Sequence, residues 1–131
     1  MSIAAFSCNV TYAPGGGGML SQNFNVAAPY TAINAGKIDV PNGTAAATAF
    51  NLPFGGVTTD TRGLLIQNNT DVDLSVDLAA SGTAQYQLAP GGLVLHWAPK
   101  KAAATALLAA TVTVTAATAA DGAIDFIVLG E

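Results

Sequence analysis

Short stretches in which hydrophobic and polar residues alternate run along most of the chain. In the clearest stretch, residues 72–78, Val72, Leu74, Val76 and Leu78 alternate with polar side chains. Successive side chains of a β-strand point to opposite faces, so this spacing predicts a strand with one buried face and one solvated face. Similar spacing predicts further strands over residues 19–27, 84–88, 93–97 and 111–115.

Two other stretches are apolar on both faces. Residues 62–68 and 123–129 read as nearly continuous apolar runs, which is typical of central, buried strands. Weaker patterns predict strands over residues 37–40 and 44–52. The alanine-rich stretch 100–110 is open between strand and short helix, because alanine favours a helix while two lysines at its start oppose the helix dipole.

Eight or nine short strands at spacings near ten residues predict an all-β fold. We expect a single domain, since 131 residues suit one domain, and the strand spacing indicates an antiparallel β-sandwich or a barrel. The glycine run at residues 15–18 sets residues 1–14 apart as an extended N-terminal arm. This predicts an arm and hinge over residues 1–18 and a sandwich over residues 19–131. The alternative for the glycine run is an ordinary surface loop.

The composition leaves little material for catalysis. Charged residues make up 9% of the chain, against about 25% in average soluble domains, and there is one His and one Cys. His96 alternates away from Leu95 and Trp97, which places it toward solvent or a neighbouring subunit and not in a catalytic dyad. Cys8 has no adjacent base to activate it. We therefore expect a protein that is not an enzyme.

Metal, cofactor and nucleic-acid binding are also disfavoured. Asp71, Asp73 and Asp77 supply oxygen ligands that Ca²⁺ could use, but their spacing does not match an EF-hand loop, and a solvated strand face explains them better. We expect no metal and no cofactor. A net charge of −4 with only Lys100 and Lys101 adjacent argues against nucleic acid and anionic membranes. No apolar run is long enough for a membrane helix.

What remains is a surface of small neutral residues, with 27 Ala, 14 Gly and 14 Thr in the chain. Such side chains lose little rotamer entropy on burial, whereas a dispersed monomer normally carries more charge. This composition predicts that much of the surface is covered by other protein, including further copies of the chain. The expected interface residues lie in the arm, its glycine run and one strand: Ile3, Phe6, Tyr12, Gly15, Gly16, Gly17, Gly18 and His96.

Residues 63–131 carry a resemblance to a known group of proteins. The segment Gly-Leu-Leu-Ile-Gln-Asn-Asn-Thr-Asp, the later Tyr-Gln-Leu-Ala-Pro-Gly-Gly and the closing Ile-Asp-Phe-Ile-Val-Leu-Gly are similar to small β-sandwich virion proteins of tailed bacteriophages. Among these, the chain most resembles capsid decoration, or cement, proteins. The resemblance implies a jelly-roll-like sandwich, made in the host cytoplasm, that binds the major capsid protein or another virion protein and stabilises the shell.

Two other functions stay open at this point. A carbohydrate- or receptor-binding sandwich of a tail fibre or adhesin would use Trp97, Tyr86, Tyr30 and Tyr12 for stacking. An enzyme would have to rely on His96 or on the aspartates of residues 71–77.

Overall fold

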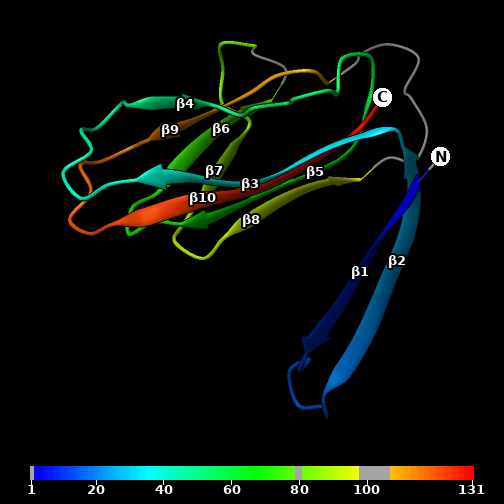
Figure 1. Ribbon diagram of the computed structural model, residues 1–131. Helices are drawn as coiled ribbons and strands as arrows, with labels where there is room; N and C mark the ends of the chain where they lie inside the picture. Colours follow the sequence, from blue (N-terminus) through cyan, green and yellow to red (C-terminus); the bar gives the residue numbers. More distant parts are fainter. Residues whose placement is uncertain (1, 79–80, 98–106) are drawn as a thin grey trace.

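The computed structural model describes residues 2–78, 81–97 and 107–131, and within them it contains ten strands and no helix (Figure 1). All strand pairs are antiparallel. Eight strands form two four-stranded sheets. Sheet I has the order β3 (Ala32–Val40), β10 (Gly122–Gly130), β5 (Thr61–Asn69) and β8 (Leu93–Trp97). Sheet II has the order β4 (Ala49–Asn51), β9 (Ala110–Val114), β6 (Leu74–Leu78) and β7 (Tyr86–Leu88).

The strand order is that of a jelly roll. The strands of the sandwich pair in a nested order, so that the first pairs with the last and the second with the second last. The four pairs are β3 with β10, β4 with β9, β5 with β8, and β6 with β7. A long folded hairpin that wraps around a barrel axis gives this nesting, and its strands then alternate between the two sheets. The sequence-based prediction of an all-β, jelly-roll-like sandwich is therefore confirmed.

The core lies between the two sheets and uses the alternating positions of each strand. Leu74 and Val76 of β6 are fully buried and face the sheet I residues Leu64, Ile66 and Ile124, which are also fully buried. Polar residues between them point outward or bind loops. The residues that form this core all come from position 32 onward, so the sandwich has a complete core of its own.

The predicted strands are confirmed, but their extents differ, and the strand expected over residues 37–40 is longer and spans Ala32–Val40. Strands β5 and β10 are central in sheet I, as their continuous apolar runs predicted. The strand expected over residues 44–52 is only Ala49–Asn51, because residues 44–48 form turns held by hydrogen bonds from Thr44 and Thr48 to nearby carbonyls. Residues 100–106 of the open helix-or-strand stretch lie outside the described residues, and β9 begins at Ala110.

The N-terminal part folds differently from a single flexible arm. Strand β1 (Ser2–Tyr12) pairs along its whole length with β2 (Leu20–Tyr30), and the glycine run lies in the loop that joins them. The expected boundary at residue 18 therefore falls inside a hairpin, since β2 pairs with β1 and not with either sheet. Figure 1 shows this hairpin projecting from one end of the sandwich. The projecting unit comprises residues 2–30.

The described residues include no helix of the length and hydrophobicity needed to cross a membrane.

Candidate functional site

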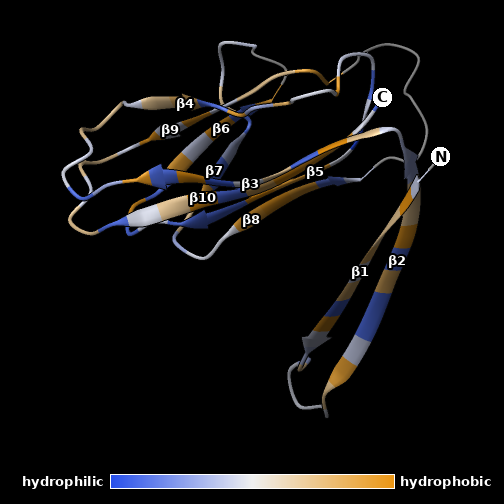
Figure 2. Cartoon of the chain, viewed as in Figure 1, coloured by the Kyte–Doolittle hydropathy of each residue, from blue (hydrophilic) through white to orange (hydrophobic). Residues whose placement is uncertain are grey.

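The hairpin has one apolar face and one mostly polar face. Cross-strand partners place the apolar side chains on one side in successive rungs. We call this set the apolar face of the hairpin: Ala4 and Ala28, Phe6 and Val26, Cys8 and Phe24, Val10 with Gln22, and Tyr12 with Leu20. Figure 2 shows the apolar and polar residues alternating along both strands.

The opposite face is mostly a ladder of small polar residues. Ser7 donates a hydrogen bond to Asn25 at 2.7 Å, and Asn9 Nδ2 donates to Ser21 at 3.1 Å and also to Asn23. These cross-strand bonds fix the register of β1 against β2. A one-residue slip would exchange the two faces, so the ladder also holds the apolar side chains on a single side.

The outer face of sheet I is apolar only at the end beneath the hairpin. One row across the strands consists of Ile33, Leu129, Gly63 and Trp97, and the next consists of Ala35, Ile127, Leu65 and Leu95. The following row holds Lys37, Asp125 and Gln67 together with Leu93, and so returns to the polar character of a solvated sheet face. The apolar rows therefore form the part of this sheet face that suits burial beneath another element, here the hairpin.

Trp97 of β8 lies between sheet I and the hairpin. Its ring lies so close to Gly63 that a Cβ at that position would be 2.8 Å from two ring carbons. On its other side, the ring of Phe6 lies 5.7 Å away, centroid to centroid, at an angle of 37°. The Trp97 Nε1 donor is buried and has no hydrogen-bond partner in the described part of the chain. Glycine at position 63 thus makes room for the residue on which the hairpin rests.

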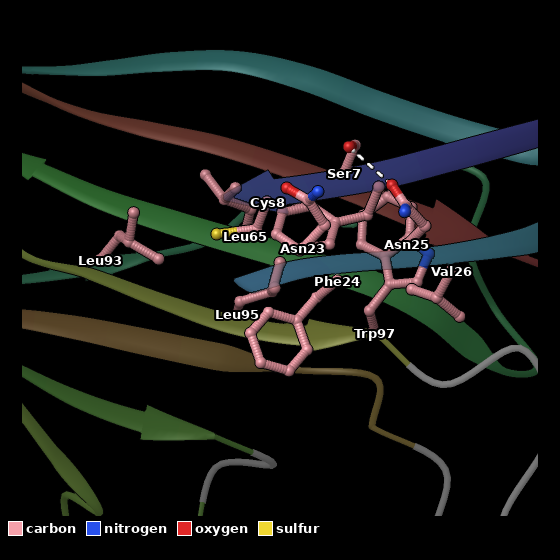
Figure 3. Close-up of a pocket in the computed structure, with 11 residues that line it drawn as sticks. Ser7, Cys8, Asn23, Phe24, Asn25, Val26, Leu65, Leu93, Leu95 and Trp97 are labelled. Atoms are coloured by element: carbon pink, nitrogen blue, oxygen red, sulfur yellow. Dashed lines mark hydrogen bonds between the residues drawn. The ribbon is translucent and has the colours of Figure 1, made fainter. Parts of the chain in front are cut away.

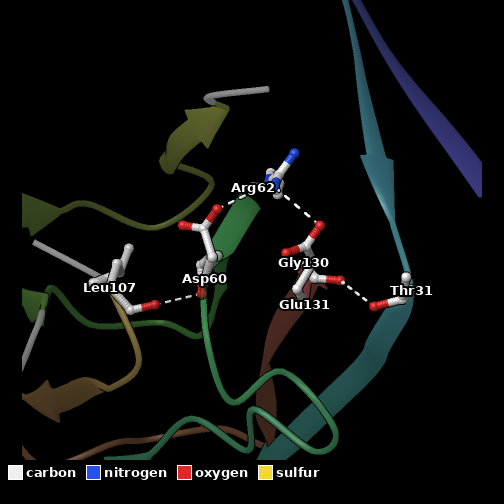
Figure 4. Close-up of polar contacts among 7 residues, drawn as sticks. Thr31, Asp60, Arg62, Leu107, Gly130 and Glu131 are labelled. Atoms are coloured by element: carbon white, nitrogen blue, oxygen red, sulfur yellow. Dashed lines mark hydrogen bonds and ion pairs between the residues drawn. The ribbon is translucent and has the colours of Figure 1, made fainter. Parts of the chain in front are cut away.

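The root of the hairpin is anchored by backbone and ionic contacts. Thr31 donates its backbone N–H to the carbonyl of Gly130 at 2.9 Å. Beside it, Arg62 bridges the carboxylates of Asp60 at 2.8 Å and Glu131 at 3.0 Å (Figure 4). Asp60 is almost fully buried, so these contacts hold the chain end of β10 firmly against β5. The hairpin therefore extends from a base that is held by a backbone hydrogen bond and two ion pairs.

Between the hairpin and sheet I there is an open cleft of about 770 Å³. Figure 3 shows its two walls, with Phe24, Val26 and Cys8 from the hairpin facing Leu65, Leu95 and Trp97 from the sheet. No charged residue lines the cleft, and Cys8 is the one titratable side chain in its walls. The cleft thus offers packing surface and very little chemistry.

Beyond the cleft, the described residues leave the apolar face of the hairpin partly uncovered. Val10, Tyr12, Leu20 and Phe24 are each about half exposed, and Met19 in the adjoining loop is 69% exposed. Six of the ten large hydrophobic residues exposed in the described structure lie in residues 2–30. A hairpin of two strands is marginally stable alone, so a projecting one gains from any surface that covers it.

The hairpin also lacks the charges that usually keep strand edges apart. Residues 2–30 contain no Asp, Glu, Lys, Arg or His, and the first charged residue of the chain is Lys37. Strands β1 and β2 pair only with each other in the described structure, which leaves one edge of each open. Natural proteins normally place lysine, proline or bulges on such edges, and here Pro29 at the root of the hairpin is the one proline in its strands.

The interface residues predicted from the sequence are only partly gathered by the structure. Phe6 faces Trp97 in the cleft, and Tyr12 lies at the tip of the apolar face. Ile3 is 71% exposed but lies on the opposite side of the hairpin, near its root. His96 is exposed on β8 and points away from the cleft, because it alternates with Leu95 and Trp97. Gly15 to Gly18 are exposed in the hairpin loop.

The sequence-based list omitted Phe24, Leu20 and Val10, which form most of the uncovered apolar face. The alternation over residues 19–27 did signal a strand with one apolar side. What it could not indicate is that this strand pairs with residues 2–12 and leaves the sandwich.

Two of the three aspartates considered for Ca²⁺, Asp71 and Asp77, use their carboxylates to bind backbone amides of the protein itself. Asp71 accepts the amide of Ala119 at 2.9 Å, whereas Asp77 accepts the amides of Ser81 and Gly82 at 3.0 and 2.8 Å. The Ser81 hydroxyl and these amides hold the pKa of Asp77 below its ordinary value. Among the described residues, no group of three or more His, Cys, Asp or Glu side chains is placed to hold a metal ion.

The aromatic residues considered for carbohydrate stacking come from separate places. Trp97 lies in the cleft beneath the hairpin, Tyr12 at the hairpin tip, and Tyr86 on β7 of sheet II. None of the three tyrosines lines the cleft.

Comparison with known proteins returned nothing: no family model, no curated protein and no solved structure matches this chain.

Proposed function

We propose that this protein is a non-enzymatic structural component of a tailed-phage virion, a decoration protein that binds the capsid lattice and stabilises it. The observation that carries the proposal is the projecting hairpin of residues 2–30, which is free of charge and half uncovered on its apolar face. The major capsid protein, or another virion protein, is the partner that this surface would bind.

The physical argument is that the hairpin has too little contact with its own sandwich. Complete burial of a side chain such as Leu20 or Val10 contributes about 1.5–3 kcal/mol, and these side chains are half exposed in the isolated chain. A subunit surface that covers the exposed half of each side chain gains about half of this free energy, and it separates no charge from water. Open strand edges on β1 and β2 add backbone hydrogen bonds as a second source of affinity.

The jelly roll is compatible with this function and does not select it. Jelly rolls occur in viral capsid proteins and also in lectins, so the fold alone supports the virion and the carbohydrate-binding alternatives equally. The uncovered end of the hairpin favours the virion alternative, because Val10, Tyr12 and Leu20 present a mostly apolar surface there. The cleft itself does not exclude carbohydrate, since three aromatic residues and three small polar residues line it: Phe6, Phe24, Trp97, Ser7, Asn23 and Asn25.

A co-sedimentation experiment tests the proposal. Particles of the phage that encodes the chain, prepared without it, are mixed with the purified protein or with a variant that lacks residues 2–30. The sandwich core contains no hairpin residue, so we expect the shortened protein to fold. We expect the full chain to sediment with particles and the shortened chain to lose about tenfold or more in affinity.

Tyr86→Ala is the matched control, because it removes an exposed aromatic residue from the far sheet. We expect it to bind particles like the original protein. The proposal fails if the full chain stays in the supernatant, or if removal of the hairpin leaves binding unchanged. Loss of binding in Tyr86→Ala alone would instead favour recognition through sheet II.

A further inference from the structure

The uncovered part of the hairpin and the open cleft beside it form one continuous apolar surface. Phe24 belongs to both, since it lines the cleft and is half exposed on the hairpin. From Phe24 the surface continues along the hairpin through Val10 to Tyr12 and Leu20. The other wall of the cleft ends at Leu93, which is 53% exposed.

This surface is complementary to itself. An occupant of the cleft must be narrow, apolar and free of charge, because no charged group is present there to meet a charged partner. The tip of the same hairpin has these properties: Tyr12, Met19 and Leu20 lie on a two-stranded ribbon without a single charge. Each copy of the chain therefore carries both the projecting element and the site that would receive it, which is the requirement for a twofold-symmetric contact.

We propose that a second copy of this chain covers the surface, with the two hairpins packed apolar face against apolar face. The proposal rests on the proposed function in that it names one partner of the same hairpin. A twofold axis near Val10 brings the rung of Tyr12 and Leu20 of one copy onto the rung of Cys8 and Phe24 of the other. The side chains that are half exposed in one chain then cover each other. The tip of each hairpin enters the open side of the other cleft.

The polar ladder stays in solvent in this arrangement. Ser7, Asn9 and Ser21 point away from the shared apolar layer and keep their hydrogen bonds. Gln22, the cross-strand partner of Val10, lies near the axis, where the side-chain amides of the two copies can bond to each other. The two ribbons would lie about 10 Å apart, as packed sheets do.

The size of the uncovered apolar surface determines the expected affinity of the dimer. The uncovered surface consists of a few half-exposed side chains, chiefly Val10, Tyr12, Leu20, Phe24 and Leu93, which is a small set beside the roughly 20–30 residues per partner of a standard interface. Association in solution is therefore expected in the micromolar range of dissociation constants, about 10⁻⁶ to 10⁻⁵ M. On a lattice that holds many copies side by side, the effective concentration is far higher, and a weak contact becomes fully occupied.

Two matched pairs of variants test the inference. Leu20→Lys places a charge on the apolar face, while Ser21→Lys places the same charge one residue later on the polar face. By sedimentation velocity over a range of concentrations, we expect the original protein and Ser21→Lys to dimerise alike. Leu20→Lys should raise the dissociation constant about tenfold or more, since a lysine would be buried in an apolar contact.

The second pair of variants tests whether the twofold axis of the dimer lies near Val10. In a Cys8→Ser background, Val10→Cys puts a thiol at the centre of the contact, and Thr11→Cys puts it on the opposite face. A short bismaleimide should link Val10→Cys chains into covalent dimers and leave Thr11→Cys chains mostly monomeric. Trp97 fluorescence verifies that each variant keeps its hairpin on the sheet.

The outcomes separate this inference from the proposed function. The inference is overturned if the original protein stays monomeric at all concentrations, if both lysine variants dimerise equally, or if both thiol positions cross-link equally. A chain that is monomeric yet binds particles would leave the proposed function standing and remove the dimer. A chain that dimerises through Val10 but does not bind particles would support the dimer and contradict the proposed function.

Discussion

At the residue scale, Asn68 shows how a neutral side chain holds a jelly-roll corner together. It is fully buried at the end of β5, and every hydrogen-bonding position of its amide is used. Nδ2 donates to the carbonyls of Val72 and Leu88, each at 2.8 Å, while Oδ1 accepts the amide and the hydroxyl of Thr70 at 2.9 and 2.7 Å. One side chain thus ties three segments of the chain together.

We expect Asn68→Ala to lower the free energy of unfolding by about 3 kcal/mol, because buried carbonyls and an amide lose their partner. Urea unfolding followed by circular dichroism measures the loss. Asn42→Ala, an exposed asparagine in a turn, is the control and should change stability by less than about 0.5 kcal/mol. Equal effects of the two substitutions would show that the buried amide network is not a main source of stability.

At the element scale, the loop from β6 to β7 is held by one carboxylate. Asp77 accepts the Ser81 hydroxyl at 2.7 Å and the amides of Ser81 and Gly82. These bonds favour the ionised form and hold the pKa of Asp77 below its ordinary value of 3.8, against the partial effect of burial. Because the pKa of Asp77 is lower in the folded state, these hydrogen bonds contribute fully to stability above pH 3.8. That contribution is lost as the pH falls through the folded pKa.

We therefore expect the amide resonances of Ser81 and Gly82 to titrate at a pH below 3.8 and to be constant above it. Nuclear magnetic resonance spectra recorded at decreasing pH measure this directly. In Asp77→Asn, which cannot ionise, the same resonances should not follow a carboxyl titration. A midpoint at or above 3.8 would mean that the loop does not bind the ionised carboxylate.

Most strands of the sandwich could be predicted from alternation alone, and the hairpin could not. The buried positions of β6 follow from alternation, because sheet I covers one side of this strand. The central place of β10 follows instead from its nearly continuous apolar run. Residues 6–12 do alternate, with Phe6, Cys8, Val10 and Tyr12 on one side and small polar residues on the other. Alternation alone does not indicate that this strand pairs with residues 20–30 and not with a sheet of the sandwich. The glycine run was interpreted as the hinge of an arm, with a surface loop as the alternative, because a glycine-rich loop and a flexible hinge have the same composition.

The candidate site was even less accessible from the sequence. Phe6 and Trp97 are far apart in the chain, and their contact depends on which sheet face β8 presents outward. Alternation assigns Leu93, Leu95 and Trp97 to one side of a strand without saying whether that side is the core. Here it is the outer side, because Val94 occupies the core position between them.

At the scale of the whole molecule, the stability of the sandwich and the position of the hairpin are coupled through one small residue. Gly63 lies in the central strand β5, beneath the Trp97 ring on which Phe6 packs. A methyl group at position 63 would be 2.8 Å from the ring and 3.1 Å from Leu129 Cγ, so the ring must move. We expect Gly63→Ala to cost about 1–3 kcal/mol and to loosen the hairpin from sheet I.

Two measurements detect that coupling. Trp97 is the only tryptophan of the chain, so its fluorescence reports directly on the ring, and hydrogen exchange at β1 and β2 reports on the hairpin. Gly36→Ala in β3 is the matched control, because its methyl group would meet the Phe126 ring at an ordinary 3.8 Å. We expect faster exchange in the hairpin of Gly63→Ala alone. Unchanged exchange, with Trp97 displaced, would mean that the root contacts of Thr31 position the hairpin without help from the aromatic pair.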